Sequence, residues 1–231
     1  MAFEHRRGTS GDLHAADPEE LLAGRASAVV LMEPTDRALV LGSSQPDSLV
    51  DRSAAAAAGF AVARRRSGGG IVVTGRDDAI WIDVLLAPGH PRSRTDVDHA
   101  AVEVGRVWQV ALVSLSNGRS AAEVGLDVHS GPSLHRESGR ILCFGGLGPG
   151  EVSLEGAKLV GISQRRARWG ARFQCQVQLR WAPHEWLGCI RPGPGAPSDL
   201  LPLTVATITP PPTGAKGLPE RIARAVASAL G

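Results

Sequence analysis

The sequence predicts an α+β domain in which helices flank a mixed or antiparallel sheet. Most apolar residues fall in short runs that glycine and proline interrupt, a pattern typical of strands joined by turns. Two segments, 95–115 and 218–230, instead repeat their apolar residues at helical spacing. No internal repeat and no boundary to a second folded unit is visible, so we expect a single domain.

The composition is that of an ordinary globular protein. The 231 residues are 43% hydrophobic and 21% charged, with a formal net charge of +2. A dedicated nucleic-acid-binding protein normally carries a strong basic excess, so no nucleic-acid partner is expected. No apolar run matches a membrane span or a secretion signal, which predicts a cytoplasmic protein without membrane contact. Cys143, Cys175 and Cys189 are odd in number and not spaced for zinc, so we expect reduced thiols.

The first half of the chain is expected to consist of strands around one short helix. Residues 1–18 are polar and aperiodic, which predicts a flexible tail, and residues 19–231 then form the domain. Segments 26–34 and 37–45 indicate two strands paired as a hairpin across a Pro-containing turn. The other elements expected here are a helix over 46–60, ending near Gly59, and strands over 61–66, 71–75 and 79–88.

The second half follows the helix at 95–115 with a further run of strands. A short helix is expected at 184–190, and a proline-rich passage at 192–212 precedes the closing helix. The segments with strand character are 122–129, 140–146, 151–156, 158–166 and 171–181.

Two motifs carry the chemistry. The stretch "RRRSGGG" at 64–70 lies between strands, so it is neither a Walker A loop nor a Rossmann fingerprint, both of which open a helix. Its arginines supply positive charge and its glycines expose backbone N–H groups, which favours an anionic ligand. In "GAKLVGISQRR" at 156–166, Lys158 begins a strand. It either polarises a carbonyl or phosphate from that position or is a solvated lysine at a strand end.

Together with "LVLGSSQ" at 39–45, these motifs resemble the biotin/lipoate protein ligase superfamily, specifically its lipoate-protein ligase A branch. The resemblance covers Ala26 to Trp181 and implies a single class II synthetase-like α+β domain. It implies an enzyme that attaches a lipoyl or octanoyl group to one lysine of a lipoyl carrier domain. The carrier would be of the 2-oxoacid dehydrogenase E2 type or the glycine cleavage H protein type.

The resemblance also implies roles for particular residues. Lys158 would contact the acyl carbonyl, and Arg65 would face the anionic end of the substrate. No metal ligand is assigned. The remaining residues implied to bind the acyl group or acyl adenylate are Ser67, Gly68, Gly69, Gly70, Gly161 and Ser163.

The chain departs from the ligase branch in places that bear on ATP and Mg²⁺. Thr74 and Gly75 stand where ligases usually have a His-Asp pair, Gly150 and Glu151 where they often have Asn-Asp, and Cys175 where a histidine is common. A lost carboxylate or imidazole removes a candidate ligand or proton carrier. The roughly 50 residues after Trp181 are too few for a separate C-terminal accessory domain, so none is expected.

The role of Cys143 distinguishes the possible reactions. It precedes Lys158 by 15 positions (158 minus 143), an arrangement similar to the cysteine-dependent octanoyltransferases and amidotransferases of the same superfamily. In those enzymes the cysteine forms an acyl thioester, and a neighbouring ammonium favours the reactive thiolate. The alternative is a small buried side chain on a strand.

Three functions therefore stay open. We favour acyl transfer through a Cys143 thioester, which needs no ATP and takes its acyl group from an acyl carrier protein or another lipoyl domain. The second is an ATP- and Mg²⁺-dependent lipoate-protein ligase that acts through lipoyl-AMP. The third is a non-catalytic module that binds lipoyl or acyl-adenylate groups, or one half of a two-chain ligase.

Overall fold

The computed structural model describes residues 3–134, 137–191, 205–208 and 217–231. Within these ranges the strands form a larger sheet of seven, ordered β1-β2-β6-β10-β9-β8-β7, and a small sheet of three, ordered β4-β3-β5. The strands are β1 (Glu4–Gly8), β2 (Ser27–Pro34), β3 (Ala38–Leu41), β4 (Ala61–Arg64), β5 (Val72–Thr74), β6 (Ala79–Leu86), β7 (Leu126–Val128), β8 (Val152–Leu154), β9 (Ala157–Ala167) and β10 (Gly170–Gln178).

Helices flank the sheets, and short 3₁₀ turns join some of the elements. None of the helices in the described ranges is long and apolar enough to cross a membrane. The α-helices are α1 (Ser10–Ala15), α2 (Pro18–Leu22), α3 (Arg52–Ala57), α4 (Val97–Ser114), α5 (Ala121–Val124), α6 (Glu137–Ile141) and α7 (Leu218–Leu230). The 3₁₀ turns are Asp47–Leu49, Cys143–Gly145, Pro183–Glu185 and Leu187–Cys189.

The predicted mixed sheet is confirmed. In the larger sheet β1 runs parallel to β2, whereas every other neighbouring pair is antiparallel. Strand β10 lies at the centre, where Phe173 pairs with Val84 of β6 and Gln164 of β9. Because side chains alternate across a strand, this register sends the odd-numbered residues 173, 175 and 177 of β10 to one face and the even-numbered residues to the other.

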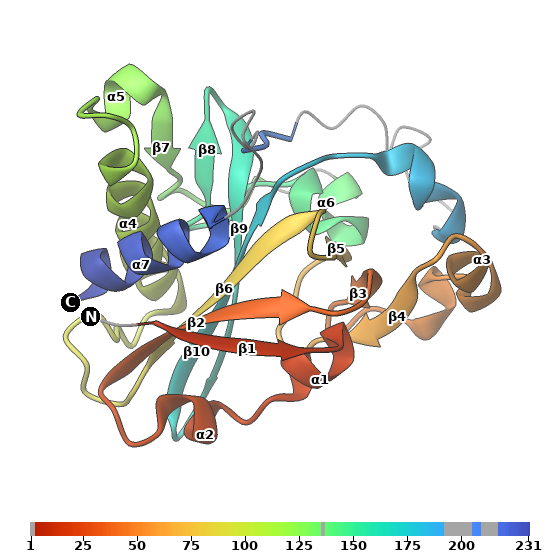
Figure 1. The fold of residues 1–231 in the computed structure, drawn as a ribbon, viewed down its shortest axis with the longest axis horizontal. Coiled ribbons are helices and arrows are strands. Elements are labelled where there is room, and N and C mark those ends of the chain that lie inside the picture. Colours follow the sequence, from red (N-terminus) through yellow and green to blue (C-terminus); the bar gives the residue numbers. More distant parts are fainter. Residues whose placement is uncertain (1–2, 135–136, 192–204, 209–216) are drawn as a thin grey trace.

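One face of the larger sheet is apolar and is covered by two helices. Figure 1 shows α4 and α7 side by side over this face, and both helices were expected from their apolar spacing. Trp108 of α4 and Phe173 of β10 are completely buried in the core between the sheet and the two helices. Asp96 caps α4 by accepting a hydrogen bond from the backbone N–H of His99, which satisfies one donor of the first turn.

The opposite face is buried as well, and it carries polar side chains beside a smaller apolar cluster under α1 and α2. Helices α1 and α2 pack against part of it, and the small sheet lies at the end of the molecule away from α4 and α5 (Figure 1). Alternate positions on β6 and β10 place charged and amide side chains here. Those buried on this face are Asp83, Arg172, Gln174, Gln176 and Gln178.

The expected flexible tail at residues 1–18 is wrong for the residues described. Strand β1 pairs with β2 along its whole length, and Leu13 and His14 of α1 are buried. Thr9 caps α1 by accepting from the backbone N–H of Asp12. Strand β1 is held by backbone hydrogen bonds at the edge of the sheet and exposes polar side chains, so its sequence carries no apolar periodicity.

Five local predictions also differ from the structure. In segment 122–129, expected as a strand, the first residues belong to α5 and only 126–128 form β7. The expected hairpin does not form, because β2 joins the larger sheet and β3 the small one. Segment 140–146 is the end of α6 followed by a 3₁₀ turn, and segment 184–190 is two 3₁₀ turns. The helix expected over 46–60 is divided into a 3₁₀ turn and the shorter α3. Only 205–208 of the proline-rich passage at 192–212 are among the described residues.

A buried ion pair joins the polar face to the N-terminal segment. Arg172 Nε lies 2.5 Å from Asp83 Oδ2, and both side chains are almost fully buried. Asp83 also accepts from Trp81 Nε1 at 2.7 Å. The remaining nitrogens of Arg172 donate to backbone carbonyls at the end of α1, at 2.8 Å to Leu13 and 3.0 Å to Ala16. The pair therefore fixes α1 against the larger sheet.

Replacing Arg172 by methionine is expected to lower the free energy of unfolding by about 3–5 kcal/mol, because it leaves Asp83 buried without its charged partner. Urea unfolding followed by circular dichroism measures this change. The double variant Arg172→Met/Asp83→Leu is expected to recover part of the loss. Arg168→Met, at an exposed position, should change stability by less than about 0.5 kcal/mol. A loss for Arg172→Met no larger than for Arg168→Met would contradict the assignment.

Candidate functional site

The candidate site forms where the loop between β4 and β5 meets the polar face of the larger sheet. Ser67 in this loop hydrogen bonds to Ser163 of β9 at 2.9 Å and donates to Gln174 of β10 at 2.8 Å. Gln176 of β10 donates to the backbone carbonyl of Val73 in β5. These contacts bring the glycine motif and the lysine motif together across the two sheets.

The glycines of the loop permit close contacts between backbones. Gly69 has a φ of +97°, a conformation that other residues rarely adopt. A Cβ atom at Gly70 would lie 2.6 Å from the carbonyl carbon of Leu142. Directly after it, Ile71 forms a parallel bridge with Leu142, and the backbone N–H of Cys143 donates to Ile71 at 2.9 Å. The loop therefore fixes the position of the segment that carries Cys143.

Arg65 stabilises the loop by hydrogen bonding to its backbone carbonyls. Its side chain is buried, and its guanidinium donates to the carbonyls of Gly68 and Gly70 at 2.8 Å and of Val40 at 3.3 Å. Burial lowers the pKa of Arg65 from its usual value, an effect that its electrostatic interaction with Cys143 opposes. Arg65 also lines the pocket described below. The expectation that it faces an anionic substrate stays a prediction.

Lys158 lies at the centre of a three-residue cluster. Its Nζ is 2.6 Å from Glu151 Oε1, 2.7 Å from the carbonyl oxygen of Cys143 and 3.8 Å from Cys143 Sγ. Lys158 and Glu151 are only 6% and 5% exposed. Burial works to lower the pKa of Lys158, but the electrostatic interactions and hydrogen bonds with Cys143 and Glu151 outweigh it and raise that pKa. The side chain is therefore an ammonium, positioned to stabilise negative charge on the sulfur or on a reacting oxygen.

Glu151 is fixed in turn by the backbone. Its Oε2 accepts from the N–H of Gly148 at 2.7 Å, and its Oε1 accepts from the N–H of Ile162 at 3.2 Å. Both oxygens are thus committed, and the carboxylate cannot turn away from the lysine without losing these bonds. From the sequence, Glu151 is only a departure from the ligase pattern, and its pairing with Lys158 was not predicted.

Of the three cysteines, only Cys143 is placed for chemistry. It lies in a 3₁₀ turn, is partly exposed and lines two pockets. Cys175 is completely buried in the core, where burial raises the pKa of its thiol, and Cys189 is buried in a second apolar cluster. The expectation that segment 140–146 is a strand was wrong, and the turn that replaces it presents the sulfur.

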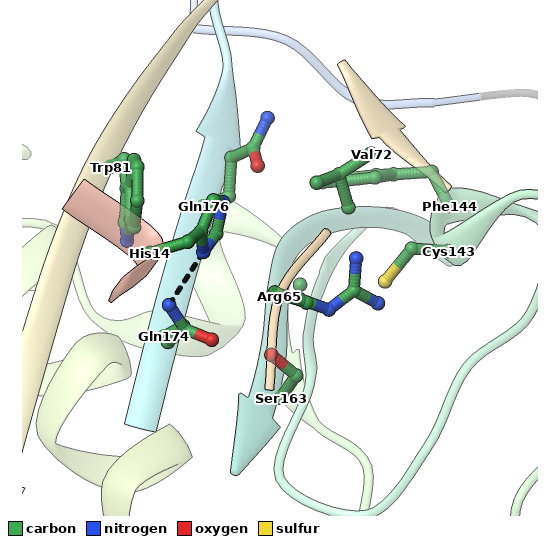
Figure 2. A pocket seen from close by; sticks show the side chains of 10 residues that line it. His14, Arg65, Val72, Trp81, Cys143, Phe144, Ser163, Gln174 and Gln176 are labelled. Carbon is green, nitrogen blue, oxygen red and sulfur yellow. Dashed lines mark hydrogen bonds between the residues drawn. The ribbon is translucent and has the colours of Figure 1, made fainter. Parts of the chain in front are cut away.

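Two hollows meet at Cys143 and Ser163. One, which we call the slot, runs between the sheets (Figure 2). The other, which we call the groove, is more open and contains Glu151 and Lys158. The slot is lined by His14, Arg65, Val72, Trp81, Cys143, Phe144, Gly161, Ser163, Gln174 and Gln176. Next to Cys143, the groove is lined by glycines 68–70, 139, 146 and 148.

The structure thus brings the candidate residues to one place. Gly161 makes room in the slot, since a Cβ there would lie 3.2 Å from Cε of Lys158 and 3.3 Å from the Phe144 ring. Ser67 does not line the slot itself, but it hydrogen bonds to Ser163, which does. Their roles in binding or catalysis stay predictions. By contrast, Thr74 hydrogen bonds to Ser10, and Gly75 packs against Asp78, so these two replaced positions have local contacts of their own.

Several slot residues were not singled out from the sequence. The glutamines of β10 alternate with apolar residues in "FQCQVQ", a pattern that could have assigned them to one face. His14 gave no such signal, because it follows the polar residues of β1. Its ring stacks on Trp81 with centroids 4.1 Å apart, and its Nδ1 is 2.9 Å from Nε2 of Gln174.

Known proteins share the fold of this chain. Residues 18–182 match the family model described as the lipoyl protein ligase A/B catalytic domain. The fold is similar to that of a lipoate-protein ligase A bound with ATP, with a TM-score of 0.71 at 13% identity over 100% of this chain and 86% of that one.

Two archaeal structures are also similar in fold. A putative lipoate protein ligase from T. acidophilum with bound lipoic acid gives a TM-score of 0.70 at 12% identity, covering 100% of this chain and 86% of that one. A bi-partite lipoate protein ligase from Thermoplasma acidophilum, studied with its E2 lipoyl domain, gives 0.67 at 15% identity, with 100% and 84% covered. A search of curated proteins found no match.

The slot has a consequence for stability at acid pH. Burial, followed by the positive charges of Arg65 and Arg172, lowers the pKa of His14 well below 6.5. The unfolded chain binds a proton at His14 below about pH 6.5 while the folded chain does not, so this part of the stability is complete above that pH and lost below it.

We therefore expect the free energy of unfolding to fall below pH 6.5 more steeply for the wild type than for His14→Phe. The difference should approach about 1.4 kcal/mol per pH unit, which is the cost of excluding one proton. Urea unfolding at a series of pH values measures both slopes. His99→Phe, at an exposed position, should keep the wild-type slope, and identical slopes in all three proteins would refute a buried neutral His14.

Proposed function

Because the chain belongs to the lipoyl protein ligase A/B catalytic-domain family, we propose that it attaches a lipoyl or octanoyl group to a lysine of a lipoyl carrier domain through a thioester on Cys143. The observation that carries the proposal is the placement of the Lys158 ammonium 3.8 Å from Cys143 Sγ, at the point where slot and groove meet. The acyl group would lie at this meeting point beside the glycine loop, and the groove would admit the group that exchanges it.

In the first step the Cys143 thiolate attacks the carbonyl carbon of an acyl thioester, such as that of an acyl carrier protein. A new carbon–sulfur bond forms to Sγ, and the bond to the donor sulfur breaks. The donor leaves as a thiol after taking up the proton that Cys143 gave up. Lys158 supplies positive charge beside the reacting centre, where negative charge develops on the carbonyl oxygen.

In the second step the carrier lysine, as a free amine, attacks the carbonyl carbon of the Cys143 thioester. The amide bond forms, the carbon–sulfur bond breaks, and the proton of the amine passes to the departing sulfur. Cys143 is regenerated as a thiol, and no ATP is consumed. The carrier would be of the 2-oxoacid dehydrogenase E2 or glycine cleavage H protein type, and the archaeal fold neighbour studied with its E2 lipoyl domain supports such a partner.

An ATP-dependent route through lipoyl-AMP is the second candidate, favoured by the fold neighbour that binds ATP. Its Mg²⁺ would need free oxygen ligands near the phosphates. Glu151 is the carboxylate that lines the groove, and its oxygens already bind Lys158, Gly148 and Ile162. These residues do not fit a magnesium ligand set, so we derive no step through the metal.

Incubating the wild type with octanoyl-acyl carrier protein is expected to add one octanoyl group that hydroxylamine removes. Intact mass spectrometry detects the adduct, and Cys143→Ala should lack it. The matched control Cys189→Ala, which removes a buried thiol, should still form it. Acyl-AMP formed from octanoate and ATP without an adduct would support the ligase route. Acyl-AMP that forms only after a partner chain is added would indicate one half of a two-chain ligase, and absence of both products even then would leave a binding module.

Replacing Lys158 by alanine is expected to lower kcat/KM for carrier acylation by at least about 100-fold, because the positive charge beside the reacting oxygen is lost. The same change leaves Glu151 buried without its cation, so stability should fall as well. The double variant Lys158→Met/Glu151→Gln separates the two effects. It should regain much of the stability but remain inactive, and near-normal acylation by it would exclude the role given to Lys158.

A further inference from the structure

Lys158 lies where two central strands of the larger sheet separate. The pairing of β9 with β10 ends at Val160 and Val177, short of Lys158. On the other side of β9, the pairing with β8 shifts register between Val152 and Ser153. The end of a strand that has lost one neighbour opens more easily than its middle. The backbone of Lys158 therefore needs a further support to stay in one place.

A short segment from far along the chain supplies this support. Val205 forms a parallel bridge with Lys158, and the backbone N–H of Ala206 donates to the carbonyl of Lys158 at 3.0 Å. The N–H of Ile208 donates to the carbonyl of Gln178, the last residue of β10, also at 3.0 Å. Residues 205–208, which we call the inserted segment, thus bind both strands where they diverge.

The inserted segment is anchored by contacts that do not involve Lys158. Ala206 and Ile208 pack against the apolar core that contains Trp108 and Phe173. Alternate residues of an extended chain point to the same side, so both side chains can reach the core while their N–H groups face the strand ends. The bond from Ala206 therefore ties the Lys158 backbone to a part of the molecule that the core already fixes.

The contacts of the Lys158 ammonium make its backbone position important. Nζ lies 2.6 Å from Glu151 Oε1, 2.7 Å from the carbonyl oxygen of Cys143 and 5.0 Å from the centre of the Phe144 ring. A shift of the strand carries the ammonium away from these groups and from the sulfur together. Misplacing a reacting group by about 1 Å can lower a rate by about 100-fold.

We infer that the inserted segment is a positioning element for Lys158, acting through the backbone N–H of Ala206. The family match covers residues 18–182, so this element lies outside the matched catalytic domain. In this chain the matched domain then needs a later part of the sequence to hold its central lysine. The expected effect on rate rests on the proposed function, whereas the expected effect on the position of the ammonium does not.

Replacing Ala206 by proline removes the N–H that binds Lys158. Thr207→Pro is the matched control, because it removes a neighbouring N–H that bonds to none of the described residues. The chain has two lysines, Lys158 and Lys216, so a ¹⁵N-lysine-labelled protein gives at most two side-chain signals, which Lys216→Arg assigns.

At pH 7 the wild-type Lys158 ammonium should give a slowly exchanging nuclear magnetic resonance signal, because it is buried and hydrogen bonded. Its protons should exchange at least about fivefold faster in Ala206→Pro and within about twofold of the wild type in Thr207→Pro. Equal exchange in the wild type and Ala206→Pro would overturn the inference. Equal acceleration by both prolines would overturn it too, since the segment would then support the fold in general.

Carrier acylation gives a second readout. Ala206→Pro should lower kcat by about tenfold or more and leave KM within about twofold, because the reacting group is misplaced while the binding surface is kept. Thr207→Pro should keep both values. If the wild type acylates no carrier, the proposed function fails, and the exchange measurement still decides the inference.

A second variant covers the case in which circular dichroism shows that Ala206→Pro does not fold. Replacing Ala206 by lactic acid, through nonsense suppression, exchanges the N–H for an ester oxygen and adds no ring. The ester should accelerate exchange of the Lys158 ammonium as proline does. An ammonium signal and a kcat that both stay at their wild-type values in the ester would show that the bond from Ala206 does not position Lys158.

Discussion

Burial of a polar surface between two sheets is the constraint on which the site depends. Strands β6 and β10 turn charged and amide side chains inward, where solvent cannot satisfy them, so each needs a partner within the protein. The Arg172–Asp83 pair meets this need and at the same time anchors α1. Gln174 and Gln176 meet it by bonding to the loop and strand of the small sheet. Satisfying these groups is what brings the two sheets into contact.

The same constraint shapes the reactive cluster. The Lys158 ammonium, although buried, keeps its charge because Glu151 and the carbonyl of Cys143 surround it. Those contacts place the ammonium next to the sulfur, so the proposed reaction would require little reorganisation when it begins. Stability and preorganisation therefore come from the same bonds, and removing one partner affects both.

The sequence predicts the central strands, the two long helices and the place of the glycine loop, because each has a clear apolar period or a turn composition. Its motifs also single out Lys158, Cys143 and the loop residues, which the structure brings close together and whose roles stay predictions. It does not predict β1 and α1, whose order comes from backbone pairing and from a distant arginine rather than from a local pattern. Glu151 was missed as the partner of Lys158 because a β-bulge between β8 and β9 and the turn at Gly148 bring them together, and neither appears in linear spacing.

The N-terminal segment contributes to the slot but not to the cluster around Cys143. The family match begins at residue 18, while α1, which ends at Ala15, contributes a wall of the slot. The cluster around Cys143 is built from three other elements. These are the 3₁₀ turn Cys143–Gly145, the loop that precedes β8, and strand β9. Mutation or exchange of a few residues before the matched region could therefore reshape the slot during evolution, while the contacts of Lys158 with Glu151 and Cys143 are inherited unchanged.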